Sequence, residues 1–357
     1  MGDEVVRFGI LGCATIAKTM SAAISTTPGA CLYAIGSRSI ERAQGFAKEA
    51  NFPTGAKIYG SYQGVLDDEM VDVVYIPLPT ALHLEWALKA AEKKKHILIE
   101  KPPALTTEDL NRITAACNKH GVQLMDCTLW MHHPRAAKVK EMLKNKEIFG
   151  DILEVHFTFL VPMEVFSPGF FKKNIRVKTD LDALGALGDL GWYCARGILW
   201  ANDYDLPSSV TALPGTKFTE DGVITSCRAS FAWDDGRVAT FSCSFHADFN
   251  VKLAIYGTNG TLEVPNIDTG DFKLYGLSIF EDMDIGWAPD IKEFEIKTVL
   301  SQESLMVQRF LSLVKGIQNG STGVDSVWPS VAMKTQQMID AVNCSIEQGC
   351  TTIALDG

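Results

Sequence analysis

The sequence predicts an α/β protein with two domains. The first is a doubly wound domain of parallel strands, and the second is an α+β domain with a large, mostly antiparallel, open-faced sheet. Three observations lead to this prediction. The chain has 357 residues, enough for roughly two domains of about 150 residues each. Its first third alternates short β-type runs with helical stretches, and beyond residue 151 longer β-type runs are joined by hairpin signals.

The first domain is expected to cover residues 1–128. Strands that alternate with amphipathic helices form right-handed βαβ units, so these strands should run parallel with helices on both faces of the sheet. The expected strands are residues 5–11, 31–36, 71–76, 96–99 and 122–127, and the expected helices are residues 15–26, 40–50, 82–93 and 107–120.

The second domain is expected to cover residues 129–357. The pairs Asp235-Gly236 and Asn259-Gly260 are typical of tight hairpin turns, which favours antiparallel neighbours in its sheet. In the strand 237–245, apolar residues alternate with small polar ones, so one face of the sheet should meet helices and the other should stay open to solvent or to another subunit. The expected strands are residues 152–161, 226–233, 237–245 and 251–256, and the expected helices at the end of the chain, candidates to pack back on the first domain, are residues 302–318 and 331–348.

Composition and charge exclude several classes of protein. A chain with 46% apolar and 21% charged residues is typical of globular proteins, and a net charge of −10 opposes general nucleic-acid binding. No apolar run approaches the roughly 18 residues that a membrane helix needs. Nine scattered cysteines without a CxxC pair indicate free thiols in a reducing compartment and no zinc site. We therefore expect a cytoplasmic protein with no metal, nucleic-acid or membrane partner.

The segment after the first strand is a candidate phosphate-binding turn. A strand that ends before Gly12 and a helix that starts at Thr15 would direct backbone N–H groups and the positive end of the helix dipole toward a pyrophosphate. The turn departs from the G-x-G-x-x-G pattern, because Ala14 and Ala17 replace the second and third glycines. The candidate contacts are Gly12, Ala14, Thr15 and Ile16.

The end of the second strand favours NADP over NAD. An NAD site usually has a carboxylate there for the ribose 2′-hydroxyl, whereas this chain has Ser37 and Arg38, with Arg42 one helical turn later. A guanidinium beside hydroxyl groups suits a 2′-phosphate. The alternative is that Arg38 is a solvated residue at the start of a helix.

Two further segments are candidates for chemistry. The buried strand 96–99 ends at Glu100-Lys101-Pro102, and ligands of doubly wound sheets bind beyond the carboxyl ends of the strands. An apolar helix that begins near residue 185 contains Asp189 and Tyr193, whose i,i+4 spacing is expected to put both side chains on one helix face.

Taken together, these segments resemble the glucose–fructose oxidoreductase, inositol dehydrogenase and MocA family along nearly the whole chain. Within it, the chain is most similar to the dihydrodiol dehydrogenase and NADP-dependent D-xylose dehydrogenase branch, because Tyr193 replaces the histidine of many members and Arg38 follows the second strand. The segments that show the resemblance are residues 9–12 with Ile16 and Ala17, residues 76–80 with His83, residues 100–102, residues 130–134, and the helix with Asp189 and Tyr193.

The resemblance implies a Rossmann domain, a second domain whose sheet often forms a homodimer, and a nicotinamide between the domains that faces a sugar, polyol or diol. It also implies that Lys101, Asp189 and Tyr193 are the catalytic residues. A tyrosine with a pKa near 10 is a poor base at neutral pH, and a nearby lysine would favour the phenolate and stabilise an alkoxide. Further cofactor contacts are implied at Pro77, Pro79, Thr80, His83, Glu100 and Lys101.

The substrate contacts are less well defined by the sequence. Met131 stands where many relatives have arginine, and the candidates for the pocket are Trp130, His133, Phe166 and Phe170. Three basic residues after these phenylalanines, Lys172, Lys173 and Arg176, are further candidates to contact a polar substrate. The predicted function is hydride transfer between NADP and a carbinol carbon. The alternative is a non-catalytic NADP-binding regulatory or sensor protein of the same fold, which retention of Lys101 and Tyr193 disfavours.

Overall fold

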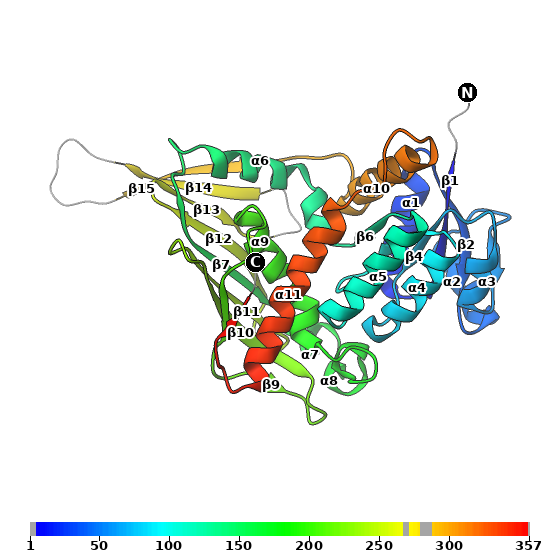
Figure 1. Ribbon diagram of the computed structural model, residues 1–357, viewed down its shortest axis with the longest axis horizontal. Helices are drawn as coiled ribbons and strands as arrows, with labels where there is room; N and C mark the ends of the chain where they lie inside the picture. The colour runs from blue at the N-terminus through cyan, green and yellow to red at the C-terminus, as the bar shows by residue number, and fades with distance from the viewer. Residues whose placement is uncertain (1–4, 267–270, 279–287, 356–357) are drawn as a thin grey trace. The chain divides into compact units, whose positions relative to one another are not determined.

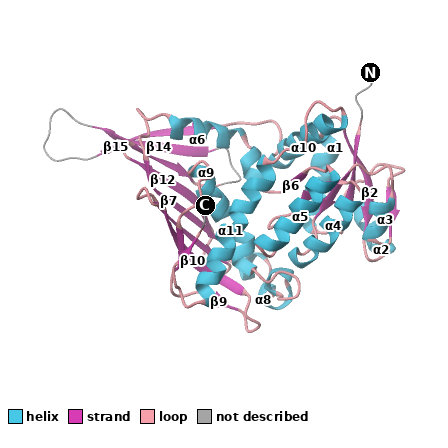
Figure 2. Ribbon diagram, in the orientation of Figure 1, coloured by secondary structure: helices cyan, strands magenta, loops and turns pink. Residues whose placement is uncertain are grey.

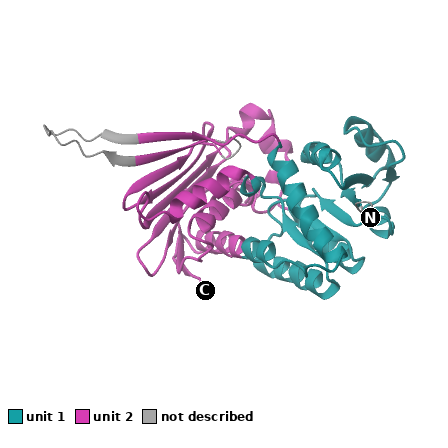
Figure 3. Cartoon of the chain, turned by 90° about the horizontal axis from the view of Figure 1, so that it is seen from above, with its two compact units in different colours: residues 1–132, 300–333 teal, residues 133–299, 334–357 magenta. Residues whose placement is uncertain are grey.

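The computed structural model describes residues 5–266, 271–278 and 288–355, and the chain divides into two compact units. Unit 1 comprises residues 1–132 and 300–333, and unit 2 comprises residues 133–299 and 334–357 (Figure 3). The long helix α11 (Val327–Glu347) contains the last division between them. Unit 1 thus includes a late segment of the chain in addition to the N-terminal region.

Unit 1 is built on a six-stranded parallel sheet with the strand order β3-β2-β1-β4-β5-β6 (Figure 1). The order reverses direction between β1 and β4, which makes their carboxyl ends the switch point where doubly wound sheets bind ligands. The strands are β1 (Val6–Leu11), β2 (Ala30–Gly36), β3 (Lys57–Tyr59), β4 (Val73–Ile76), β5 (His96–Ile99) and β6 (Leu124–Asp126).

Helices cover both faces of this sheet because successive residues of each strand point in opposite directions. Phe8 and Ile10 of β1 lie in one apolar cluster with Met20 of α1 and Phe310 of α10, whereas Gly9 faces Val65 of α3. Helix α4 packs against β4 and β5. The helices of unit 1 are α1 (Thr15–Thr26), α2 (Ile40–Glu49), α3 (Tyr62–Asp67), η1 (Thr80–Leu82), α4 (His83–Glu92), α5 (Thr107–His120), η2 (Leu129–His132) and α10 (Gln302–Gln318).

Local capping signals explain where several of these helices begin and end. The Thr106 side chain accepts the Asp109 N–H at the start of α5, and Gly121 ends the helix in the left-handed region at φ 68°. Strand β3 and helix α3 were not predicted. Both are short, and β3 exists as a strand because it pairs with β2.

Unit 2 contains a ten-stranded sheet with the order β15-β14-β13-β12-β7-β11-β10-β8-β16, and β9 pairs with β10 (Figure 2). All of its pairs are antiparallel except β7 with β11, so the predicted fold class of both domains is confirmed. The strands are β7 (Ile152–Leu160), β8 (Ser209–Ala212), β9 (Lys217–Phe218), β10 (Ile224–Ala232), β11 (Val238–Ser244), β12 (Asn250–Gly257), β13 (Gly260–Val264), β14 (Asp271–Ser278), β15 (Ala288–Glu295) and β16 (Ile353–Ala354).

The two faces of this sheet differ, as the alternation in β11 predicts. Ala239, Phe241 and Cys243 are buried, and α9 packs against β7 and β11. On the opposite face, Ser242 of β11 lies beside Thr158 of β7, and both are only partly buried. The other helices of unit 2 are α6 (Pro134–Lys144), α7 (Met163–Phe166), α8 (Phe170–Lys173), η3 (Ile175–Val177), η4 (Leu187–Gly191) and α9 (Trp192–Ala201).

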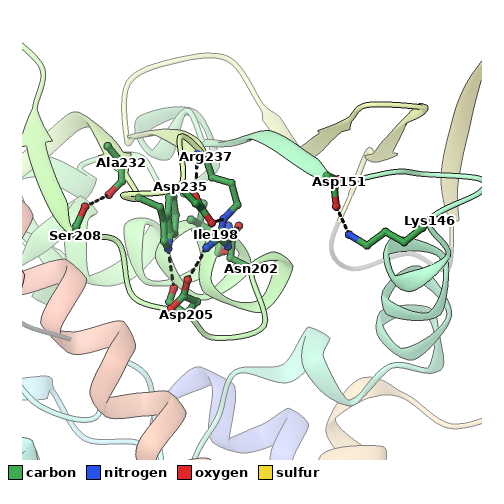
Figure 4. Close-up of polar contacts among 10 residues, drawn as sticks. Lys146, Asp151, Ile198, Asn202, Asp205, Ser208, Ala232, Asp235 and Arg237 are labelled. Carbon is green, nitrogen blue, oxygen red and sulfur yellow. Dashed lines mark hydrogen bonds and ion pairs between the residues drawn. The ribbon is translucent and has the colours of Figure 1, made fainter.

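The turn at Asp235-Gly236 joins β10 to β11, as predicted, and an arginine anchors it. Arg237 donates to Asp235 at 2.7 Å, to Asn202 at 2.9 Å and to Asp205 at 2.5 Å (Figure 4). Asn202 and Asp205 follow the end of α9, so one guanidinium ties the hairpin to the helix that covers the sheet. The second predicted hairpin, at Asn259-Gly260, joins β12 to β13.

Candidate functional site

The predicted cofactor residues of unit 1 gather at one edge of its sheet. They follow the carboxyl ends of β1, β2, β4 and β5, and these ends share an edge because all four strands are parallel. Hydrogen bonds link the loops at this edge. Gly12 N–H donates to the Gly36 carbonyl at 2.8 Å, and Glu100 N–H donates to the Ile76 carbonyl at 3.1 Å.

The turn after β1 has the features of a pyrophosphate cradle. Gly12 has φ 108°, and a Cβ atom there would lie 2.9 Å from Cδ2 of Leu78, so only glycine fits without strain. Ala14 is the N-cap of α1 and has no side-chain acceptor, and the first turn of α1 contains no acidic residue. The N–H groups in the first turn of α1 therefore have no side-chain cap, which suits the binding of a phosphate at this helix end.

Positive charge lies beside this turn, at the end of β2. Arg38 and Arg42 are exposed, and Ser37 is buried with its N–H bonded to the Tyr59 carbonyl at 3.1 Å. Cys13, next to Gly12, lies 3.8 Å from the backbone oxygen of Arg42. Burial raises the pKa of the Cys13 thiol, while Ser37 and the positive charge of the Arg42 side chain act in the opposite direction. The two guanidinium groups have the charge and the position for a nucleotide 2′-phosphate.

The loop after β4 is held to the loop after β5 by His83. Its Nδ1 lies 3.0 Å from the Pro102 carbonyl and its Nε2 lies 2.8 Å from the Leu78 carbonyl. The ring is 1% exposed, and burial lowers its pKa to about 4, so it stays neutral. The sequence suggested a cofactor contact at His83, whereas both ring nitrogens face backbone oxygens, and in the neutral ring one of the two nitrogens donates. Beside it, Pro77 and Thr80 are buried and Pro79 is partly buried.

The Glu100 carboxylate accepts hydrogen bonds from other residues of unit 1. Its Oε1 accepts from the Tyr75 hydroxyl at 2.6 Å, and its Oε2 accepts from the Lys101 N–H at 3.3 Å. Tyr75 is fully buried in β4, the strand beside β5. The Lys101-Pro102 peptide is cis. The backbone of Lys101 is therefore bonded to the side chain of Glu100, and the side chain of Lys101 is partly buried. The sequence gave no signal for the role of Tyr75.

In unit 2, Asp189 lies in η4, which is a π-helical turn, and not in a regular α-helix as predicted. Single π-turns are frequent at functional sites. The Asp189 carboxylate is 8% exposed and accepts from Nε of Arg176 at 2.9 Å. Arg176 belongs to η3, so the ion pair joins this short helix to the π-turn. Sequence reasoning suggested Arg176 only as a substrate contact and missed the pair.

Tyr193 follows in the first turn of α9, and its ring packs on Phe159 of β7 with centroids 5.5 Å apart.

Gly185 precedes the π-turn at φ 54°, and a Cβ atom there would lie 2.1 Å from the Ile224 carbonyl oxygen. The close approach of residue 185 to β10 requires glycine at this position. It brings the backbone that leads to Asp189 against the sheet.

The structure gives the four predicted substrate residues different environments. Trp130 is buried in η2 of unit 1. His133 caps α6, because its Nδ1 accepts the Arg135 N–H at 3.0 Å. Phe170 is a core residue that packs on Phe245 with centroids 5.1 Å apart, whereas Phe166 is 64% exposed. Capping and core packing account for His133 and Phe170 without a substrate.

No group of three or more His, Cys, Asp or Glu side chains is arranged to hold a metal ion in the part of the chain that the structure describes. Within the same residues, no helix has the length and apolar character needed to cross a membrane.

Comparison with known proteins gives matches in both units. Residues 6–126 match the oxidoreductase family with an NAD-binding Rossmann fold, and residues 136–263 match the GFO/IDH/MocA C-terminal domain. The chain is 32% identical to dTDP-3,4-didehydro-2,6-dideoxy-alpha-D-glucose 3-reductase from Saccharopolyspora spinosa over 72% of its length and 74% of that protein. It is 31% identical to D-xylose 1-dehydrogenase (NADP(+)) 2 from Haloferax volcanii over 72% of its length and 75% of that protein.

A solved structure has the same fold over nearly the whole chain. KijD10, a 3-ketoreductase from Actinomadura kijaniata in complex with NADP and TDP-benzene, matches with a TM-score of 0.79 and 24% identity, over 96% of this chain and 98% of that one. The similarity in fold therefore extends through both units and beyond the two family matches.

Proposed function

This chain belongs to the GFO/IDH/MocA oxidoreductase family, and from this premise we propose that it is an NADP-dependent dehydrogenase or reductase. Its substrate would be a sugar, polyol or diol, and a hydride would move between the nicotinamide and a carbinol or keto carbon of that substrate. The observation that supports the cofactor most directly is the Gly12 turn with the N-terminus of α1, beside Arg38 and Arg42. Relatives named as NADP-dependent sugar dehydrogenase and sugar 3-reductase support the substrate class.

Unit 1 contains the residues that would hold NADP. Backbone N–H groups of Thr15 and Ile16 would bind the pyrophosphate, and Arg38 and Arg42 would bind the 2′-phosphate. Leu78 and the neighbouring prolines would form the wall against which the nucleotide lies. His83 would act as a positioning residue, because it fixes the loops after β4 and β5 relative to one another.

Three side chains are assigned to the chemistry, and one of them, Tyr193, would transfer the proton. Residues of unit 1 would hold a nicotinamide cofactor, which would supply or take up the hydride. During oxidation, the Tyr193 phenolate would accept the proton from the substrate hydroxyl, and during reduction it would return that proton. The Lys101 ammonium would stabilise negative charge on the substrate oxygen. Asp189, held by Arg176, would orient the polar groups around them.

The direct test replaces Lys101 with alanine and separates cofactor binding from turnover. Titration with NADP and NAD comes first, followed by a panel of aldoses, polyols and trans-diols monitored by nicotinamide absorbance. We expect NADP to bind more tightly than NAD, and Lys101→Ala to retain NADP binding but lose turnover. Lys119→Ala, an exposed lysine of α5, is the matched control. Unchanged turnover in Lys101→Ala would exclude the assigned role, and binding without turnover in wild type would favour a sensor.

We also propose a homodimer that pairs the open face of the ten-stranded sheet in each copy. The face carries small polar side chains such as Thr158 and Ser242, which permit close approach of a second sheet. Light scattering should give about twice the 39.1 kDa of one chain. Ser242→Arg should give monomer, whereas Arg237→Met, away from this face, should stay dimeric. Monomeric wild type would exclude the dimer.

The cytoplasm is the proposed location. All nine cysteines are free thiols, including three that are buried close together in unit 2, and free thiols persist in reducing compartments. Tagged protein should fractionate with cytoplasmic markers, and recovery from a secreted or organellar fraction would contradict the assignment.

A further inference from the structure

Tyr75 is a buried tyrosine in the middle of the parallel sheet of unit 1. Its strand, β4, pairs on one side with β1 and on the other with β5, and Tyr75 itself lies between Ile10 and Leu98. Strand β1 leads into the proposed phosphate-binding turn, and β5 leads into Glu100 and Lys101. Tyr75 is therefore placed between the two strands whose ends carry the proposed cofactor and catalytic groups.

The Tyr75 side chain combines an apolar environment with one polar atom. It is 0% exposed and belongs to the apolar cluster that contains Phe8, Met20 and Phe310. A phenol is costly to bury without a hydrogen-bond partner, and its hydroxyl donates to Oε1 of Glu100 at 2.6 Å. Hydrogen bonds to an ionised acceptor are about twice as strong as neutral ones. Packing alone would be served by phenylalanine, so the hydroxyl group has a further role, and its partner indicates which.

Hydrogen bonds hold the backbone before, at and after Lys101. The Glu100 N–H donates to the carbonyl of the last residue of β4 at 3.1 Å. Oε2 of Glu100 accepts the Lys101 N–H at 3.3 Å, and the carbonyl of Pro102 lies 3.0 Å from Nδ1 of His83. The contact at Lys101 itself depends on the orientation of a carboxylate, which is free to rotate unless its other oxygen is held. Tyr75 holds that oxygen from a rigid strand.

We propose that Tyr75 is a positioning residue that fixes Lys101 through the Glu100 carboxylate. The inference rests on the proposed function, in which Lys101 stabilises charge on the substrate oxygen. Such a group loses effect steeply when it is displaced, and a shift of about 1 Å can lower a rate by about 100-fold. The residues proposed to bind the phosphates of NADP belong to other loops. Loss of the Tyr75 hydroxyl should therefore lower kcat and leave NADP binding in place.

The test uses Tyr75→Phe in the full chain, which keeps the ring and removes only the hydroxyl. We expect kcat for the best substrate of the panel to fall by about tenfold, as for loss of a hydrogen bond to a charged group, with the Kd for NADP unchanged within about twofold. Hydrogen exchange, followed by mass spectrometry, should become faster in the peptide that contains Lys101, because the acceptor of its N–H is less well held.

Tyr59→Phe is the matched control. Tyr59 is another tyrosine of unit 1 whose hydroxyl donates to a carboxylate, that of Asp68 at 2.7 Å. Its loss should leave both kcat and the exchange of the Lys101 peptide unchanged, whatever it does to the Tm. An equal effect of the two substitutions would mean that Tyr75 only stabilises the unit, and would overturn the inference.

A double-mutant cycle with Glu100→Ala tests whether Tyr75 acts through the carboxylate. In that background Tyr75→Phe should cause no further loss of kcat, because the hydrogen bond is already absent. Losses that multiply in the double mutant, an unchanged kcat or unchanged exchange in Tyr75→Phe, or a loss of NADP affinity equal to the loss of kcat would each overturn the inference and leave the proposed function in place. Turnover that persists in Lys101→Ala would overturn the proposed role of Lys101 and the inference together.

Discussion

Replacement of Arg176 by methionine should impair turnover through Asp189 without preventing NADP binding. The Arg176 Nε lies 2.9 Å from the Asp189 carboxylate, whose side chain is 8% exposed, whereas that of Arg176 is 40% exposed. Two charges about 4 Å apart interact by about 4 kcal/mol at an effective dielectric constant of 20. Solvent screening of the half-exposed arginine reduces this to roughly 1–2 kcal/mol.

That energy corresponds to a loss of about 5- to 30-fold in kcat/KM, since each 1.4 kcal/mol is a factor of ten. Without the guanidinium, the Asp189 carboxyl should take up a proton more readily, so the acidic limb of the pH–rate profile should move to higher pH. The assay is kcat/KM from pH 5 to 9 with the best substrate of the panel, beside the Kd for NADP. Arg176→Lys should recover part of the activity because it restores the charge but not the guanidinium geometry.

Arg237→Met is the matched control for Arg176→Met. Arg237 also bonds to aspartates of unit 2, but these belong to the β10–β11 hairpin and the loop after α9 (Figure 4). Its loss should lower thermal stability and leave the pH–rate profile in place. If Arg176→Met had the same profile as wild type, or if Arg237→Met moved its profile equally, Asp189 would not be held for catalysis by Arg176.

Three further predictions concern unit 1. Gly12→Ala should destabilise unit 1 by about 1–3 kcal/mol, because alanine is strained at φ 108°, and it should also weaken NADP binding. An unchanged Tm and an unchanged Kd for NADP would contradict the proposal that the Gly12 turn binds the pyrophosphate. Burial lowers the pKa of His83 and of His96 to about 4. Between pH 6.5 and 4 the unfolded chain therefore binds a proton at each histidine and the folded chain does not. The free energy of unfolding should fall over this range by about 3 kcal/mol per histidine. Urea unfolding midpoints between pH 4 and 7 measure this dependence, and His96→Asn should reduce the slope of the unfolding free energy against pH by about one proton. A slope equal to that of wild type would contradict the prediction. Alkylation of the native protein at pH 8 should modify the partly exposed Cys13 and spare Cys117, because burial raises the pKa of Cys117 to about 12. NADP should protect Cys13 from alkylation. If NADP did not change the labelling of Cys13, this residue would not lie near the cofactor.

Most of unit 1 could be predicted because its strands and helices alternate in the sequence, and each carries its own period of apolar residues. The exceptions are β3 and α3, a strand of three residues and a helix of six. Elements of this size have too few residues to show a period. The structure of β3 depends on its pairing with β2, and α3 follows shortly after β3 in the chain.

In unit 2, strands β7, β10, β11 and β12 were predicted, and the rest of the sheet was not, including β14 and β15, which have eight residues each. Strands β8 and β16 are short, and they are strands because they pair with each other across a long separation in sequence. The segment with Phe166 and Phe170 was misleading for a similar reason. These two residues are only four positions apart, yet Phe166 is exposed and Phe170 is in the core.

The sequence by itself determined the fold class, the candidate nucleotide turn at Gly12, the cofactor preference suggested by Arg38, and the strand end at Lys101. These are local properties, since periodicity, a required glycine and a charge at a strand end all belong to short segments. The tertiary structure was needed to show which groups meet: His83 with two backbone carbonyls, Arg176 with Asp189, and Tyr75 with Glu100. Such contacts join segments that a single sequence does not relate, because they arise from the register of strands and the packing of helices on a sheet.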